Sequence, residues 1–394
     1  MGRDQQVYHR PDYARDMARQ LLRPGPLEVN VRSGVFLSGI RRIGKTTFLR
    51  EDLVPELERE GAVVIYVDLW ADPSKNPMNL VLEAVRATLA ALADASSSLL
   101  GRLSRLKGLN LGAAGFSFGF QIDAVGEAGV GGATLAQAFT AIVDAARTDV
   151  VLIVDEVQQA MGADGGSTLM HALKAARDAV NTRPGTPGYL LFLGTGSHRS
   201  LITEMATRRS QPFMGAQASI YAPLDEAFVA WKLAAIRALP GAAIPSSEVA
   251  ADGFRLLGCR PEELTKALVQ LQDVVRQRGL SADQAFPVIC DTLAQAMADV
   301  EMRAVEDFGV LGQAVFDLIA RNDADAVSGL FGRAALEEYA ARTGREVEPS
   351  HVQNVIDKLV ESNLIARAGQ GAYRVVDPFV RQYWRGRAAL LRGR

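Results

Sequence analysis

Short apolar runs alternate with longer amphipathic stretches from Ser33 onward. Apolar runs of about four to eight residues are typical of buried strands, whereas apolar positions three and four apart are typical of helices. Strands are predicted at Val35–Ser38, Val63–Val67, Val150–Val154, Leu190–Gly194 and Ser219–Tyr221. The segments between them are long enough for crossover helices, so the pattern predicts an α/β fold with a parallel sheet.

The regions on either side of these strands have a helical pattern. A polar helix is predicted at Tyr13–Leu22, and the Pro24-Gly25-Pro26 break follows it. Residues 225–307 have helical spacing throughout. The last part predicts three helices and then a two-stranded turn, at Leu311–Arg321, Gly332–Arg342, Pro349–Asn363 and residues 364–376. Three helices followed by a small hairpin form a winged helix-turn-helix.

Residues 109–122 interrupt the alternation of strands and helices. Their apolar and small residues alternate, which predicts a β-hairpin insertion followed by a flexible stretch at Gly126–Gly132. A disordered loop is the alternative, because the segment is rich in glycine. An exposed hairpin would offer a protein partner or a neighbouring subunit three phenylalanines: Phe116, Phe118 and Phe120.

The composition is that of a globular protein with two or three domains. The chain has 394 residues, of which 48% are hydrophobic and 22% charged, and its net charge is -2. Only local patches could therefore attract nucleic acid. Two cysteines, Cys259 and Cys290, exclude a disulfide framework and fit a reducing compartment. Neither a signal peptide nor a membrane span is expected, so we predict a cytoplasmic protein without a membrane partner.

The pattern G-x-x-x-x-G-K-[ST] occupies residues 39–46, between a predicted strand and a predicted helix. Its glycines let backbone N–H groups turn toward phosphate oxygens, and the helix N-terminus adds positive potential. Lys45 is predicted to reach the β- and γ-phosphates, and Thr46 to coordinate Mg²⁺. The predicted nucleotide-binding residues are Gly39, Ile40, Arg41, Arg42, Ile43, Gly44, Lys45, Thr46 and Thr47.

A second motif supplies the carboxylates that such a loop needs. The apolar run Val150–Val154 ends in Asp155 and Glu156. Asp155 is the predicted Mg²⁺ ligand, and Glu156 lies where a base polarises the attacking water. Two acids at a strand end also suit the start of the next helix, which is the alternative interpretation. Together the two motifs predict a nucleotide hydrolase that uses Mg²⁺.

Further candidates for the chemistry are hydroxyl groups and arginines. Thr195 and Ser197 follow the strand Leu190–Gly194, and they are candidate sensors of the γ-phosphate or the water. Simple turn chemistry is the alternative for either residue. Phosphoryl transfer also needs positive charge, as an arginine finger across a subunit interface or as a sensor in a lid. The candidates are Arg208, Arg209 and Arg260, with solvated surface positions as the alternative.

In order along the chain, these motifs resemble those of the archaeal-type ATPases, which are P-loop ATPases close to the AAA+ and STAND groups. The resemblance rests on Arg41-Arg42 inside the loop, Gln158 after the acids, Gly194–Ser197, Gly258-Cys259-Arg260-Pro261 and the C-terminal winged helix. It implies a strand inserted between the phosphate-loop strand and the Asp155 strand. It also implies ATP as the nucleotide and a helical lid over its base.

Two positions depart from the family pattern. Phe213–Ala216 ends in alanine where the family often carries an arginine, which favours Arg208 or Arg209 for that role. Cys259 replaces the second glycine of the lid motif, so close backbone approach there is in doubt.

The predicted fold class is α/β: a parallel-sheet P-loop core of the ASCE, AAA+-like kind, with a helical lid and a winged helix. The predicted parts are an N-terminal helical segment (1–32), the ATPase core (33–224, with the 109–132 insertion), the lid (225–307) and the winged-helix domain (308–394).

The winged helix raises the question of a partner. Its recognition helix, Ser350–Asn363, presents His351, Gln353, Asn354 and Lys358 to bases or phosphates. Basic residues follow in the wing and tail, namely Arg367, Arg374, Arg381, Arg385, Arg387, Arg392 and Arg394. Asp357 and Glu361 weaken this face for DNA.

Two hypotheses remain open. One is an ATPase that couples its nucleotide state to double-stranded DNA through residues 350–394. The other is a nucleotide-operated switch, in signalling or defence, that assembles with a protein partner or as a homo-oligomer.

Overall fold

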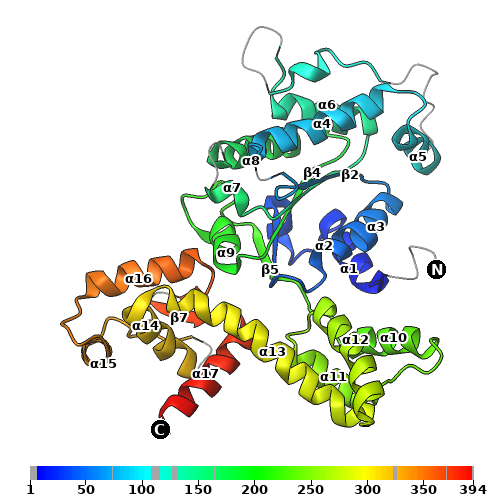
Figure 1. Ribbon diagram of the computed structural model, residues 1–394. Coiled ribbons are helices and arrows are strands. Elements are labelled where there is room, and N and C mark those ends of the chain that lie inside the picture. The colour runs from blue at the N-terminus through cyan, green and yellow to red at the C-terminus, as the bar shows by residue number, and fades with distance from the viewer. Residues whose placement is uncertain are drawn as a thin grey trace. The chain divides into compact units, whose positions relative to one another are not determined.

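The computed structural model describes residues 7–72, 74–107, 116–126, 132–162, 166–322, 326–369 and 371–392. The chain divides into two compact units (Figure 1). The first holds residues 1–39 and 45–221, and the second holds residues 40–44 and 222–394. The phosphate-loop residues 40–44 are therefore grouped apart from Lys45. The predicted division into four parts stays a prediction.

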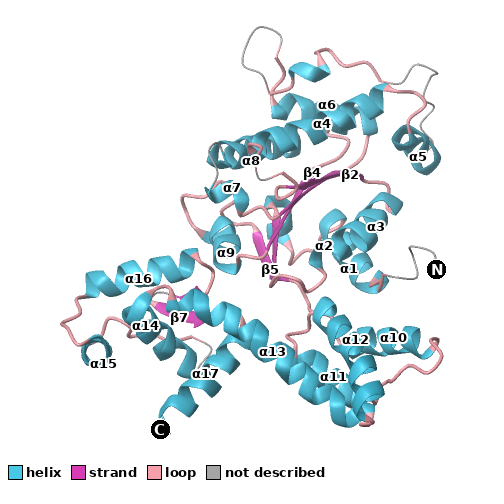
Figure 2. Cartoon of the chain, in the orientation of Figure 1, coloured by secondary structure: helices cyan, strands magenta, loops and turns pink. Residues whose placement is uncertain are grey.

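The first unit is built on a sheet of five parallel strands, in the order β2-β3-β4-β1-β5. Figure 2 draws the strands in magenta. The strands are β1 (Val35–Ser38), β2 (Val63–Asp68), β3 (Val150–Asp155), β4 (Leu190–Gly196) and β5 (Gln217–Ile220). Each lies within two residues of its predicted range. Because β4 lies between β1 and β3, the inserted strand that the family resemblance implied is confirmed.

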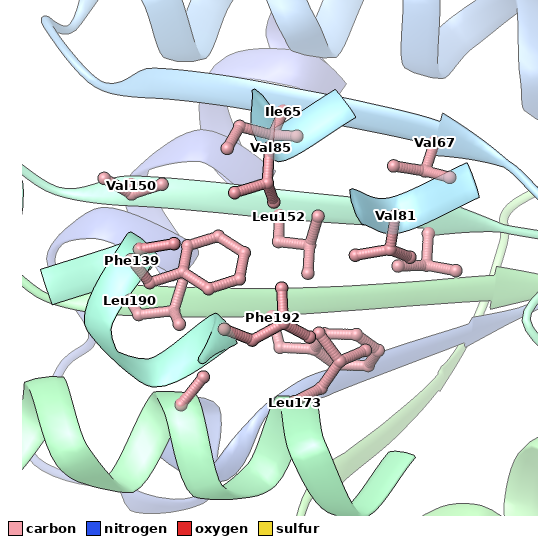
Figure 3. Close-up of a cluster of buried hydrophobic side chains, with 14 of the residues drawn as sticks. Ile65, Val67, Val81, Val85, Phe139, Val150, Leu152, Leu173, Leu190 and Phe192 are labelled. Atoms are coloured by element: carbon pink, nitrogen blue, oxygen red, sulfur yellow. The ribbon is translucent and has the colours of Figure 1, made fainter. Parts of the chain in front are cut away.

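Three helices cover one face of the sheet: α4 (Pro77–Ala93), α6 (Leu135–Ala146) and α8 (Gly166–Asn181). In Figure 3, Val85, Phe139 and Leu173 from these helices lie against Leu152 and Phe192 of the sheet. Every residue of β3 and β4 is buried. A strand covered on both faces needs apolar side chains at successive positions rather than at alternate ones, which explains the continuous runs in the sequence.

The other side of the sheet carries a helical run that begins at the phosphate loop (Figure 1). It consists of α2 (Lys45–Phe48), the π-helical turn η3 (Leu49–Leu53) and α3 (Val54–Arg59). Pro55 follows the π-helical turn and has no N–H to donate, which interrupts the regular ladder there. The predicted N-terminal helix is present as α1 (Pro11–Leu22) and packs beside this run.

The remaining elements of the first unit are short or lie at its edges. They are η2 (Val29–Ser33), α5 (Ser98–Lys107), η4 (Ile122–Ala124), α7 (Gln159–Gly162) and α9 (Arg199–Thr207).

The hairpin predicted at 109–122 is not formed by the residues that the structure describes there. Residues 116–121 contain no strand, and η4 follows them. Phe116, Phe118 and Phe120 are half-buried against the hydrophobic core, so they are not presented to a partner as predicted. The N–H of Phe116 donates to the carbonyl of Leu92 at 3.1 Å, at the end of α4. Packing on the core therefore explains the alternation of apolar and small residues. Residues 109–115 and 127–131 lie outside the described residues.

The second unit begins with four helices, as the helical spacing predicted. They are α10 (Glu226–Arg237), α11 (Ser247–Leu256), α12 (Pro261–Arg278) and α13 (Ala282–Glu306).

Three more helices and an antiparallel pair of strands follow, in the order that a winged helix requires. They are α14 (Gly309–Arg321), α15 (Arg333–Thr343), α16 (Pro349–Glu361), β6 (Ile365–Gly369) and β7 (Ala372–Val375). A last helix, α17 (Pro378–Arg392), forms where the sequence suggested only a basic tail. Pro378 suits a first helical position, and Asp377 accepts the N–H of Phe379 at 3.0 Å. None of the described helices combines the length and the apolar character needed to cross a membrane.

Candidate nucleotide site and nucleic-acid interface

The phosphate loop turns through two residues in the left-handed region, Arg42 at a φ of 65° and Gly44 at 87°. Glycine adopts this conformation freely, whereas it costs arginine about 1 kcal/mol or more. The loop leaves the sheet where the N–H of Gly39 donates to the carbonyl of Gly196 at 3.0 Å. The end of β4 therefore lies beside the start of the loop, as the parallel order requires.

Thr46 connects the loop with the carboxylate at the end of β3. Its Oγ1 donates to Oδ2 of Asp155 at 2.7 Å. A hydroxyl group has one proton and two lone pairs, so Thr46 gives its proton to Asp155 and keeps its lone pairs for a cation. Thr46 is also exposed, although Asp155 is only 1% exposed. The pair fits the Mg²⁺ ligation that the sequence predicted.

Asp155 accepts hydrogen bonds on both oxygens. Tyr66 donates to Oδ2 at 2.9 Å, the Glu156 N–H donates to Oδ1 at 3.0 Å, and Thr195 Oγ1 also donates to Oδ1. With Thr46, these donors use the four acceptor positions of a carboxylate, so Asp155 would hold Mg²⁺ through Thr46 and the hydration shell of the metal. Thr195 thus contacts the metal-ligand candidate itself, whereas we predicted a contact to phosphate or water.

Two opposing effects act on the pKa of Asp155. Burial raises it, because the carboxylate loses hydration. Hydrogen bonds from Thr195 and Thr46 and the charge of Lys45 outweigh burial, so the net pKa is lowered. Asp155 is therefore ionised at neutral pH, which is the form that binds a divalent cation.

Lys45 and Glu156 lie together at the same edge. Lys45 is only 6% exposed, and its Nζ lies 3.6 Å from Oε1 of Glu156. Glu156 has a left-handed backbone with a φ of 53°, a strained conformation for a non-glycine residue. Ser197 Oγ donates to Oε2 of Glu156 at 3.0 Å. The serine thus helps to hold this carboxylate next to Lys45.

The side chain of Gln158 lies close to Gly196, in the segment Gly194–Ser197. Its Nε2 donates to Oε2 of Glu156 and to Ser197 Oγ, the latter at 3.4 Å. A Cβ on Gly196 would lie 1.9 Å from Oε1 of Gln158, so a larger residue there would displace the Gln158 side chain from its present position. The sequence indicated Gln158 only through the family resemblance, because its contacts cross between two strand ends.

The predicted arginines occupy different surroundings. Arg208 and Arg209 are exposed after α9, and Arg208 forms an ion pair with Glu204 one turn earlier. Arg260 lies in the second unit, where its Nη2 is 2.6 Å from Oδ2 of Asp377. Among the described contacts, none joins Arg208 or Arg209 to Asp155 or Glu156.

Cys259 occupies the position where the family has a glycine, and it adopts a left-handed φ of 54°. The backbone there thus retains the conformation that a glycine would favour. This conformation is strained for cysteine, because cysteine has a Cβ.

Sequence reasoning missed Tyr66, Arg50 and Asp68. Asp68 pairs in register with Asp155, which places the end of β2 beside the end of β3. The available signal in the sequence was Tyr66 and Asp68, two residues apart at a strand end. Only the structure shows that both lie beside Asp155.

No protein-family model and no curated protein matches the chain. Among solved structures, the ORC2 protein of Aeropyrum pernix in its ADPNP-ADP complexes aligns over 97% of this chain and 94% of that chain, with 14% identity and a TM-score of 0.53. Its ADP form aligns over 98% and 96%, with 13% identity and a TM-score of 0.50. The chain has an ORC2-like fold.

This likeness is one of fold alone. At 14% identity it does not extend to activity. The ORC1 protein of the same organism in complex with DNA aligns with a TM-score of only 0.39, a level that does not establish a shared fold.

In this chain, α16 presents His351, Asn354 and Lys358 to solvent, as predicted for a recognition helix. Gln353 is half-buried, and its Nε2 donates to Oδ1 of Asp357 at 2.8 Å. Arg367 of the wing also donates to Asp357, at 3.3 Å. Two of the candidate groups for DNA contact, on Gln353 and Arg367, are therefore hydrogen-bonded to Asp357.

Two arginines of the predicted basic tail contact the end of α14. Arg381 and Arg385 donate to the carbonyls of Ala320 and Asn322, which are among the last carbonyls of that helix and its cap. The predicted tail surface for DNA is smaller by these two residues. Residues 393–394 lie outside the described part of the chain, and the side chains of 387–392 are not described.

Proposed function

We propose that this protein binds ATP with Mg²⁺ and hydrolyses it. The observation that carries the proposal is the meeting of Thr46, Asp155, Lys45 and Glu156 at one edge of the sheet. Distant parts of the sequence supply these groups, and each has the chemistry that phosphoryl transfer needs. The ADPNP and ADP in the complexes of the Aeropyrum pernix ORC2 protein support the nucleotide assignment through the shared fold.

In the proposed mechanism, Thr46 would hold the metal directly and Asp155 would hold it through its hydration shell; the metal would supply positive charge to the phosphates. Lys45 leaves Glu156 and contacts the β- and γ-phosphates. Glu156 then polarises the attacking water as a general base, and Ser197 holds its carboxylate in place. Thr195 acts by orienting Asp155. Arg208, Arg209 and Arg260 remain candidates for the additional positive charge.

The test is phosphate release from ATP by the full chain, with Mg²⁺ and with EDTA. We expect turnover only with Mg²⁺, and its loss in Lys45→Ala. Equal turnover by Lys45→Ala and the parent would rule out this site as the source of hydrolysis.

We further propose that the nucleotide state is coupled to duplex DNA through α16. His351, Asn354 and Lys358 are exposed on one helix and carry groups that contact bases and phosphates. A mobility shift with duplex DNA at low salt, with and without ATP, tests this coupling. Absence of a shift in both states would exclude it.

One observation favours the second candidate function, a nucleotide-operated assembly switch. Asp357 takes hydrogen bonds from Gln353 and Arg367, which leaves the recognition face less basic. A protein partner or a second copy of the chain would then be the target. Light scattering distinguishes the two candidates, because a switch changes mass with ATP but not with ADP.

A further inference from the structure

Asp155 is held from both neighbouring strands by hydroxyl groups. Thr195 comes from β4 on one side, and Tyr66 comes from β2 on the other. Tyr66 donates to Oδ2, the same oxygen that accepts the proton of Thr46. A carboxylate oxygen with two donors is fixed in direction, so Tyr66 helps to set how Asp155 faces the lone pairs of Thr46.

Arg50 in turn holds Tyr66. Its guanidinium carbon lies 4.7 Å from the centroid of the Tyr66 ring, and its Nη2 lies 3.6 Å from Oδ2 of Asp68. Arg50 lies in η3, four residues after Thr46 on the same helical run. Residues four apart share a helix face. The run that begins with the phosphate loop therefore contacts Asp155 directly through Thr46 and indirectly through Arg50 and Tyr66.

We propose that Tyr66, supported by Arg50, is a positioning residue that sets the Mg²⁺ affinity of the nucleotide site. This inference rests on the proposed function, in which Thr46 and Asp155 hold Mg²⁺. Tyr66 does not touch the metal or the nucleotide; it orients the carboxylate of Asp155, which would hold the metal through Thr46 and the hydration shell. Partners that orient metal ligands typically change metal affinity by about tenfold or more when removed.

Tyr66→Phe removes only the hydroxyl group and keeps the ring under Arg50. The measurement is binding of a fluorescent ATP analogue to the full chain, in EDTA and across a magnesium series. We expect the half-saturating Mg²⁺ concentration to rise about tenfold. Affinity in EDTA should stay within about twofold, because the nucleotide contacts of the loop remain.

Arg50→Gln gives a second, independent variant. It should raise the half-saturating Mg²⁺ concentration about threefold, the size of a partly exposed cation–π contact. Arg50→Lys retains the positive charge over the ring, so it should restore most of the parental value. In the double variant with Tyr66→Phe, loss of Arg50 should add little, since both act through Asp155.

Tyr189→Phe is the matched control. Tyr189 also lies beneath an arginine, with the Arg32 guanidinium carbon 4.1 Å from its ring centroid, but it precedes β4 at the opposite end of the sheet. Its magnesium dependence should equal that of the parent.

Two results would overturn the inference. One is an unchanged magnesium midpoint in both Tyr66→Phe and Arg50→Gln. The other is an equal loss of affinity with and without Mg²⁺, which would indicate general structural damage. If the parent chain binds nucleotide with no magnesium dependence, the proposed metal site itself is wrong and the inference falls with it.

Discussion

Two polar regions of the chain use the same kinds of residues in opposite ways. At the carboxyl edge of the sheet, Lys45 lies beside Glu156. The neighbouring carboxylate of Asp155 accepts hydrogen bonds, one of them from Thr46. In the C-terminal region, charged groups join one helix to another. Asp317 of α14, which is 3% exposed, accepts from Arg342 of α15 at 2.6 Å and from Trp384 of α17 at 3.1 Å.

The difference lies in where the charges point. In the C-terminal network, the charges offset one another between packed helices and so hold the elements in place. At the sheet edge they gather beside a strained backbone at Glu156 and an exposed hydroxyl at Thr46. Convergence on an accessible position indicates chemistry, whereas convergence between helices indicates architecture.

The largest effect is expected from Glu156→Gln. Loss of the base should lower turnover about 100-fold or more, while ATP binding is retained. Lys45→Ala should instead weaken binding, since the phosphates lose their cation. Single-turnover hydrolysis and nucleotide titration separate the two. Turnover like that of the parent in Glu156→Gln would remove Glu156 from the mechanism and weaken the contrast between the regions.

Asp317→Ala tests the architectural side of the comparison. Removing one partner from a buried charge network should cost about 2–4 kcal/mol, below the full value because Arg342 is partly exposed. Nucleotide affinity should not change. Urea unfolding and nucleotide titration measure the two effects, with the exposed Glu346→Ala as control. Stability like that of the control would show that the network is not structural.

DNA binding can distinguish an exposed basic residue of the C-terminal region, such as Lys358, from one that is already hydrogen-bonded, such as Arg381. Lys358→Ala should weaken duplex binding a few-fold and reduce the salt slope by about one. Arg381→Ala should leave the slope unchanged, because Arg381 already donates to the carbonyls of Ala320 and Asn322. Fluorescence anisotropy at several salt concentrations measures both. An equal loss of slope in the two variants would place Arg381 on the DNA surface.

The smallest effect concerns acid. The pKa of Asp155 is lowered in the folded state, so the unfolded chain takes up its proton first as the pH falls. The stability from ionised Asp155 is complete above the ordinary aspartate pKa of about 3.9 and is lost below it. Urea unfolding at pH 5 and pH 3 should show a smaller pH-dependent loss in Asp155→Asn than in the parent. Equal losses would mean that this carboxylate is not stabilised as its hydrogen bonds indicate.

Local pattern was sufficient to predict many elements. The five strands, the phosphate loop and the helices of the second unit lie close to their predicted positions, since burial on both faces and helical spacing are visible in neighbouring residues. The segment at Phe116–Phe120 was misinterpreted because alternation is also produced by an extended chain packed on a core. The helix α17 was missed because its arginines were taken as a surface for DNA.

The sequence alone determined which groups of the candidate site exist: Lys45, Thr46, Asp155, Glu156 and the hydroxyls of Thr195 and Ser197. Only the tertiary structure decided which oxygen each donor serves. Tyr66 and Thr195 reach the same carboxylate because β2 and β4 flank β3 in register, and Arg260 pairs with Asp377 over a separation of 117 residues. Such pairings depend on strand order, register and helix packing between distant segments, which no local pattern of residues encodes.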